Sequence, residues 1–251
     1  DPYTVRVRDG WLLGRGVADD KGPSILCLYA LKYLKDSGTP LRYPVRALLG
    51  TNEETNMGDV AYYEKHFPMP AFCFTPDAEF PVCNGEKGGF NGEIVSPVFS
   101  DGVIVDFAGG VAHNAVPDRA HCVVRAAASA FRLKDGVTLE DNGDGTVTLR
   151  GWGKSGHAAM PQGTVNAIGL LVNCLLDSGV CSPAETAYLK VLQKLHASTD
   201  GSTLGIAADD GLFDPLTIIG GTIELADGAI RQRFDCRFPP HTDAEKLTAA
   251  L

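Results

Sequence analysis

The sequence lacks a cluster of basic residues. Its 251 residues include 22 lysines and arginines against 31 aspartates and glutamates, which gives a formal net charge of −9. Binding to nucleic acid requires a basic face that neutralises phosphate groups. The charge balance therefore argues against nucleic acid as a partner.

A long apolar run is also missing. No stretch approaches the roughly 20 apolar residues that a membrane-spanning helix requires, and no secretory signal opens the chain. With 44% hydrophobic residues, the chain is able to bury a substantial core, as two domains or as one large one. We expect a globular, cytoplasmic protein without a membrane partner.

Paired cysteines are absent as well. The seven cysteines are scattered and form no Cys-x-x-Cys pair, so the sequence predicts neither a disulfide framework nor a zinc thiolate site. Several lie in apolar runs, such as Cys27 within residues 25–28. We interpret the cysteines as reduced core residues, with a catalytic cysteine as the less favoured alternative.

Strands and helices are predicted to alternate in the first third of the chain. Alternating segments around Asp9-Gly10 are typical of a β-hairpin, and a helix is predicted to begin at Pro23 and to end before Gly38. Short apolar runs at 45–50 and 71–74 are typical of buried strands, with a helix between them at 58–66. We expect an α/β arrangement with a mostly parallel sheet.

Acidic residues follow each of these segments. Asp19 lies in the run GRGVADDKGP at 14–23, Glu53 and Glu54 follow the first expected strand, and Asp77 follows the second. Since the carboxyl ends of parallel strands share one edge, these carboxylates would crowd together, and a cation would offset their repulsion. Each acid alone could instead be a helix cap, a solvated loop residue or a turn former. Together they predict a metal site, for which Mg²⁺, Mn²⁺, Ca²⁺ and Zn²⁺ remain open.

The acidic motifs carry a family resemblance. The runs GRGVADDKGP at 14–23, GTNEE at 50–54 and PDAEFP at 76–81 resemble the signature of the two-zinc aminoacylase, carboxypeptidase G and carnosinase family. The last run, with GEKG at 85–88, narrows the likeness to the bacterial dipeptidase V branch. The resemblance implies a di-zinc dipeptidase, with Mn²⁺ or Co²⁺ as substitutes. It further implies a monomer that cleaves dipeptides or short peptides with a free C-terminal carboxylate.

The same resemblance assigns roles to the acids. It makes Asp19 the ligand that bridges two zinc ions, with Glu54 as a ligand of one ion and Asp77 as a ligand of the other. Glu53 would be the general base that takes a proton from water. The peptide bond between Asp19 and Asp20 is expected to be cis.

Two histidine ligands that the family requires are not visible. No histidine precedes the run at 14–23, and the one His-x-Asp motif, at 241–243, precedes an expected helix that Thr242 or Asp243 would cap. We therefore expect the chain to be an internal fragment of a longer enzyme, inactive and weak in zinc binding by itself.

From residue 88 the pattern is typical of antiparallel strands. Strands are predicted at 91–97, 102–107, 217–219 and 229–238, a hairpin joins 137–140 to 146–149, and helices are predicted at 165–176 and 183–196. We expect residues 1–87 to be part of a catalytic, metal-binding domain. Residues 88–251 resemble the family's inserted α+β lid domain, which binds substrate.

Three residues of the expected lid are candidates for substrate contact. His157 lies in GKSGHA at 153–158, which resembles the segment whose histidine stabilises the tetrahedral oxyanion in this family. Asn114 could contact the substrate or form a turn. Arg237 lies on an apolar strand, where a guanidinium needs an anion. The resemblance implies a substrate carboxylate, and an internal acid such as Asp235 is the alternative.

Three functions remain open. The favoured one is a dipeptidase. An enzyme that deacylates N-acyl amino acids would need the same metal chemistry, and an inactive homologue could serve as a binding module. The intact acidic motifs argue against the inactive homologue.

Overall fold

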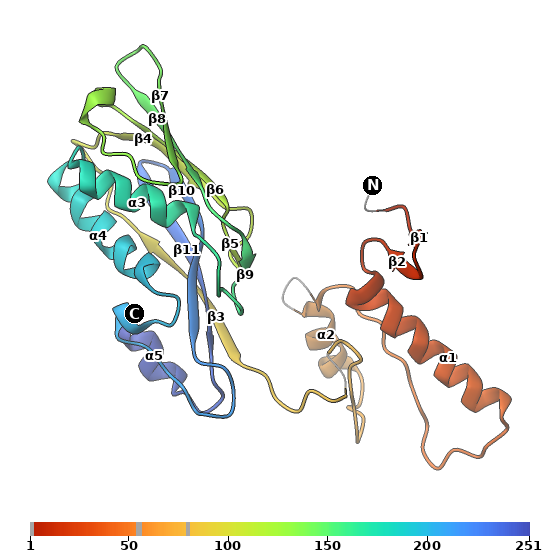
Figure 1. Cartoon of the computed structure of the whole chain (residues 1–251). Helices are drawn as coiled ribbons and strands as arrows, with labels where there is room; N and C mark the ends of the chain where they lie inside the picture. The colour runs from red at the N-terminus through yellow and green to blue at the C-terminus, as the bar shows by residue number, and fades with distance from the viewer. Residues whose placement is uncertain (1–2, 54–56, 79–80) are drawn as a thin grey trace. The chain divides into compact units, whose positions relative to one another are not determined.

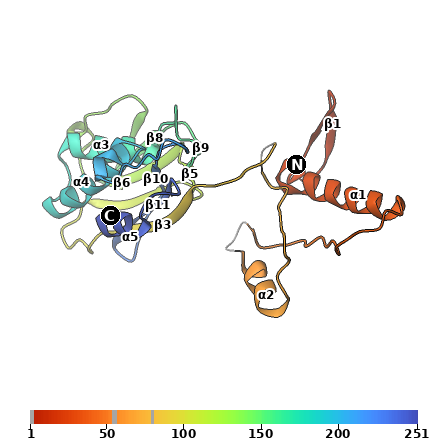
Figure 2. The same cartoon turned by 90° about the horizontal axis from the view of Figure 1, so that it is seen from below.

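The computed structural model describes residues 3–53, 57–78 and 81–251, so Glu54 lies outside the described residues. The chain divides into two compact units, Asp1–Asn84 and Gly85–Leu251. Both are drawn in Figures 1 and 2. Within the described ranges, no helix is long and apolar enough to cross a membrane.

The first unit contains a hairpin and two α-helices. Strand β1 (Arg6–Arg8) pairs antiparallel with β2 (Trp11–Leu13) across the Asp9-Gly10 turn, in which both residues have positive φ. The helices are α1 (Gly22–Asp36) and α2 (Gly58–His66). The hairpin and both helices confirm the predictions from sequence.

The strands predicted at 45–50 and 71–74 are not formed. Neither segment makes a sheet pairing, and large side chains in both are exposed, 63% for Leu49 and 80% for Phe72. A strand needs a neighbour for its backbone N–H and C=O groups, and a parallel sheet needs cover on both faces. No described residue of the first unit is buried, so no described part of this unit covers the faces of such a sheet. The mostly parallel sheet is therefore not confirmed, and every sheet pairing among the described residues is antiparallel.

A seven-stranded antiparallel sheet is the centre of the second unit. Its strand order is β3-β11-β10-β4-β6-β8-β7. The strands are β3 (Gly88–Val95), β4 (Ile104–Gly109), β6 (Arg119–Val124), β7 (Val137–Asp141), β8 (Val147–Trp152), β10 (Thr217–Ala226) and β11 (Ala229–Phe238). A separate two-stranded pair is formed by β5 (Ala115–Val116) and β9 (Gly156–His157). The predicted antiparallel strands of this part of the chain are confirmed.

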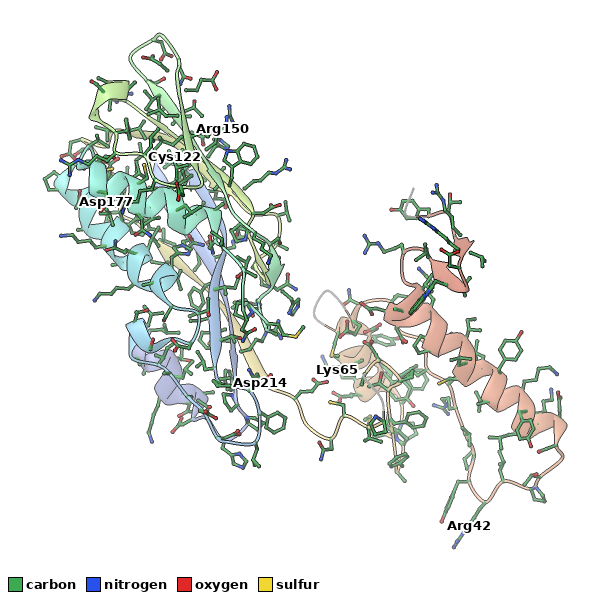
Figure 3. The ribbon with its side chains drawn as sticks, in the orientation of Figure 1. Arg42, Lys65, Cys122, Arg150, Asp177 and Asp214 are labelled. Atoms are coloured by element: carbon green, nitrogen blue, oxygen red, sulfur yellow. The ribbon has the colours of Figure 1, made fainter. Side chains whose placement is uncertain are left out.

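Two helices, α3 (Ala167–Ser178) and α4 (Pro183–Ala197), cover one face of this sheet (Figure 1). On β6, alternate residues face the helices. Cys122, labelled in Figure 3, belongs to one buried cluster with Leu171 and Leu175 of α3. Short 3-10 turns lie at η3 (Ala128–Ala130) and η4 (Ser202–Leu204). Alternation on the strands thus places the main core between the sheet and the helices.

The last helix is α5 (Ala244–Ala250). The side chain of Asp243 caps it by accepting the N–H of Lys246 at 3.1 Å. The interpretation of the His-x-Asp motif as a helix start is confirmed.

None of the seven cysteines is in a disulfide. Cys122, Cys174 and Cys236 are buried, and burial raises the pKa of the Cys236 thiol to about 12. Such thiols stay protonated and inert, as expected of core residues. The core interpretation is wrong for Cys73 and Cys83, which are exposed because the segments around them are not packed into a sheet.

Mild acid should destabilise the second unit through His196. Its Nε2 lies 3.2 Å from Oε1 of the completely buried Gln232. Desolvation lowers the pKa of the His196 ring from 6.5 to about 4. Between these two values the unfolded chain binds a proton that the folded unit does not, so the free energy of unfolding falls as the pH falls through this window. Urea unfolding near pH 7 and near pH 4.5 measures this loss.

The matched variants for this measurement are His196→Gln and His113→Gln. His113 is exposed, so its replacement should leave the wild-type loss in place, whereas His196→Gln should lose less stability on acidification. An equal loss in His196→Gln and wild type would contradict the role of His196.

Candidate active site

The glycine-rich run folds into a tight turn before α1. In η1 (Val17–Lys21), the N–H of Lys21 donates to the carbonyl of Gly16 at 2.9 Å. Gly16 has a φ of +73°, and a Cβ there would lie 2.7 Å from Nζ of Lys21. A Cβ on Gly22 would overlap the carbonyl oxygen of Val17. Glycine at these positions lets the chain fold back before the helix.

The two aspartates of this turn have different surroundings. Their peptide bond is cis, as expected. Asp19 is exposed and lines an open cleft with Arg15 and Lys21. For Asp20, Oδ2 accepts a hydrogen bond from Oγ of Ser24 at 3.1 Å, while Oδ1 is buried without a partner among the described residues. Asp19 is therefore the carboxylate that this turn presents to solvent.

Asp59, in the first turn of α2, holds the segment that leads to Glu53. Its Oδ2 accepts the N–H of Thr51 at 2.6 Å and the N–H of Asn52 at 3.0 Å. The hydrogen bond from Thr51 is the main cause that lowers the pKa of Asp59 below its usual value. Asp59 was not among the residues predicted from sequence, and its only signal is an acid in the first turn of a helix.

The described acidic residues of the first unit do not form a metal site by themselves. Glu53 and Asp77 are both exposed. Among the residues that the structure describes, no three histidine, cysteine, aspartate or glutamate side chains are grouped to hold a metal ion. Asp19 and Asp77 offer oxygen atoms alone, whereas zinc sites in proteins are usually completed by nitrogen or sulfur ligands. The described donors therefore do not fit a complete zinc shell.

Asn114 and His157 lie side by side in the second unit. Ala115 of β5 pairs with His157 of β9, and the carbonyl of Asn114 accepts the N–H of Ala158 at 2.9 Å. The ring of His157 is exposed, and its Nδ1 accepts the N–H of Ala159 at 3.1 Å. Because Nδ1 is an acceptor, the neutral ring carries its proton on Nε2. An Nε2–H group of this kind is suited to donate to an oxyanion.

The β5–β9 pair packs on the sheet face opposite the helices. Val116 and Ala158 form a small buried cluster with Ile219 of β10. The neighbouring Ile218 belongs instead to the cluster on the helix side, as alternation along a strand requires. A bulge follows in β10, where a Cβ on Gly221 would overlap the backbone of His113. Glycine thus permits the close approach of the loop that carries Asn114.

Arg237 lies on the same sheet face. Arg237 of β11 pairs with Thr217 of β10, and Asp235 of β11 pairs with Ile219 of β10. Since residues two apart on a strand share a face, Arg237 and Asp235 lie on the same face as Ile219. Nε and Nη2 of Arg237 donate to the two carboxylate oxygens of Asp235 at 2.8 and 3.0 Å. This hydrogen bonding raises the pKa of the guanidinium above its usual value. Arg237 therefore pairs with the internal acid Asp235, which the sequence left open as the alternative to a substrate carboxylate. Asn114, His157 and Arg237 all lie on one face of the sheet.

Known proteins match this chain along most of its length. The family model of Peptidase family M20/M25/M40 matches residues 1–251. The "Putative dipeptidase YtjP" of Bacillus subtilis is 34% identical over 242 residues, which cover 91% of this chain and 52% of that protein. The Beta-Ala-Xaa dipeptidase of Lactobacillus delbrueckii subsp. lactis is 30% identical over 265 residues, which cover 98% of this chain and 56% of that protein.

The chain thus spans about half the length of these curated relatives. The family match agrees with the resemblance found in the acidic motifs. The chain belongs to peptidase family M20/M25/M40.

Proposed function

We propose that the full-length protein is a metal-dependent dipeptidase. Its substrates would be dipeptides or short peptides with a free C-terminal carboxylate. Membership of a peptidase family and relatives named as dipeptidases support this proposal. The observation that carries it is the grouping of His157, Asn114 and Arg237 on one sheet face, because a proton donor, an amide and a guanidinium suit the polar groups of a peptide.

Each residue would act on a different part of the substrate. The free edge of the Arg237 guanidinium would bind the terminal carboxylate. The Nε2–H of His157 would donate to the peptide carbonyl oxygen as negative charge develops there, and Asn114 would add a polar contact. Glu53 would take a proton from the attacking water and deliver it to the leaving amine.

The proposal includes two zinc ions. Enzymes of this family generally use zinc or other divalent metals, and such an ion polarises carbonyl groups and lowers the pKa of bound water. Asp19, Glu54 and Asp77 would be among the ligands, with Mn²⁺ or Co²⁺ as substitutes. Since Asp19 and Asp77 do not complete a shell, ligands beyond the described residues are part of the proposal.

The two units would have separate tasks. We assign the first unit to the metal-binding domain and the second unit to a substrate-binding lid. The exposed segments at 45–50 and 71–74 would bury their apolar side chains by joining a parallel sheet in the full-length protein. Cysteines without disulfides agree with a reducing compartment such as the cytoplasm, where the protein would act as a monomer.

A substrate panel tests the proposed function. The full-length protein with added zinc should hydrolyse Ala-Ala and β-Ala-His. C-terminal amides of these peptides should be poorer by about tenfold in kcat/KM, because they cannot accept both hydrogen bonds of a guanidinium fork. Faster cleavage of N-acetyl amino acids would identify a deacylase instead. No turnover of any substrate, without bound metal, would identify a binding module.

A further inference from the structure

We propose that Asp235 and Gly89 are positioning residues that orient the Arg237 guanidinium toward the carboxylate of the substrate. This inference rests on the proposed function, since it concerns the same site. Neither residue would touch the substrate. Both would act through the placement of Arg237.

Asp235 occupies one edge of the guanidinium. The Asp235 side chain is 1% exposed, and its two oxygens accept from Nε and Nη2 of Arg237, whose side chain is 34% exposed. Within the part of the chain that the structure describes, Nη1 has no hydrogen-bond partner. Because Asp235 occupies the edge formed by Nε and Nη2, the edge formed by Nη1 and Nη2 is left for a second carboxylate.

Gly89 provides the space under the guanidinium. It pairs with Arg237 across β3 and β11. A Cβ at this position would lie 3.2 Å from both Cδ and Nη1 of Arg237, so the arginine would have to move by a few tenths of an ångström. The guanidinium is thus held at its edge by Asp235 and lies over a strand backbone without a side chain.

This arrangement matters because a free arginine samples many rotamers. Binding a carboxylate would then require the side chain to become ordered, which weakens the affinity. A guanidinium already held by a buried carboxylate loses little freedom on binding. We therefore expect Asp235 to affect KM for substrates with a free carboxylate and to leave the chemical step nearly unchanged.

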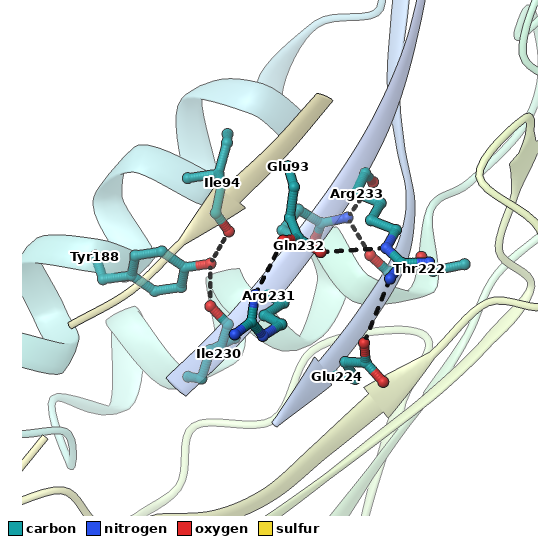
Figure 4. Close-up of polar contacts among 9 residues, drawn as sticks. All are labelled: Glu93, Ile94, Tyr188, Thr222, Glu224, Ile230, Arg231, Gln232 and Arg233. Carbon is teal, nitrogen blue, oxygen red and sulfur yellow. Dashed lines mark hydrogen bonds and ion pairs between the residues drawn. The ribbon is translucent and has the colours of Figure 1, made fainter. Parts of the chain in front are cut away.

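The same two strands offer a matched control. Glu93 of β3 accepts hydrogen bonds from Arg231 and Arg233 of β11, both at 3.1 Å (Figure 4). Its side chain is 28% exposed. Replacing Glu93 with Gln removes a carboxylate–arginine interaction from the same strands without touching Arg237.

The first experiment compares Asp235→Asn and Glu93→Gln in the full-length protein with added zinc. For Ala-Ala, Asp235→Asn should raise KM about tenfold and keep kcat within about twofold, since only one hydrogen bond of the pair can be kept. Its KM for Ala-Ala amide should match that of wild type. Glu93→Gln should leave KM unchanged for both substrates.

A second variant keeps the inference testable if Asp235→Asn fails to fold. Gly89→Ala leaves Asp235 intact and makes the guanidinium shift by a few tenths of an ångström, so it should raise KM for Ala-Ala about threefold with little effect on the amide. An unchanged KM in Gly89→Ala, or in a folded Asp235→Asn, would overturn the inference.

A double variant separates positioning from a general structural effect. Arg237→Lys loses the bidentate fork and should itself raise KM about tenfold. If Asp235 acts through Arg237, adding Asp235→Asn to Arg237→Lys should raise KM by no more than about twofold further. Fully additive losses would overturn the inference. Failure of the proposed function is distinguishable, because wild type would then not turn over Ala-Ala, would cleave N-acetyl amino acids faster, or would show equal KM for Ala-Ala and its amide.

Discussion

Replacing Glu53 with Gln in the full-length protein is expected to lower kcat for Ala-Ala hydrolysis by about 100-fold or more. Glutamine has nearly the same size as glutamate but cannot take a proton from water at neutral pH. The effect should fall on kcat and not on KM, because the substrate would be held by other residues. Steady-state kinetics and metal analysis of the same preparation measure both expectations, and the metal content should stay near that of wild type.

Glu64→Gln is the matched control for this variant. Glu64 is an exposed glutamate of α2, in the same unit as Glu53, so its replacement should leave kcat unchanged. If Glu53→Gln turned over as fast as wild type, Glu53 would not be the base. If it lost its metal, Glu53 would have a structural role at the metal site.

Replacing Glu185 with Ala should reduce the free energy of unfolding of the second unit by about 2–4 kcal/mol. This side chain is completely buried at the start of α4. Its two oxygens accept the N–H of Ser182 at 2.9 Å and the N–H of Ile104 at 2.8 Å. Alanine removes half of the capping box and leaves the first N–H of β4 without its acceptor. Urea unfolding followed by circular dichroism measures the loss.

Glu185→Gln is the comparison for this substitution. Its side-chain oxygen can keep one of the two hydrogen bonds, so its loss of stability should be smaller than that of Glu185→Ala. Equal stability of wild type and Glu185→Ala would show that the carboxylate does not tie α4 to β4.

Sequence was a good guide to elements that local signals determine. The positive-φ turn at Asp9-Gly10, the hairpin of β7 and β8, and the cap at Asp243 all depend on residues within a few positions of one another. The strands predicted around Leu49 and Phe72 had the right apolar pattern and still did not form. A buried parallel strand depends on neighbours that its own sequence does not contain.

In the candidate site too, the residues could be predicted from local motifs, whereas their arrangement could not. Motifs drew attention to Asn114, His157 and Arg237, but their arrangement on one face required the pairing of β5 with β9 and the alternation of β10. The role of Asp59 could not be predicted, because its partners are the backbone N–H groups of Thr51 and Asn52. Nearly every residue has a backbone N–H group, so the sequence gives no sign of which ones a carboxylate will bind. Only the folded chain shows which backbone groups a carboxylate meets.

The bulge at Gly221 has a consequence for how this site tolerates change. The loop with Asn114 approaches β10 through the backbone of His113, at a point where any side chain on Gly221 would overlap it. At this point the main chain of the loop lies against the main chain of β10. If Asn114 contacts the substrate as proposed, substitutions at 113 and 114 would alter substrate preference while the loop keeps its course, whereas position 221 is restricted to glycine.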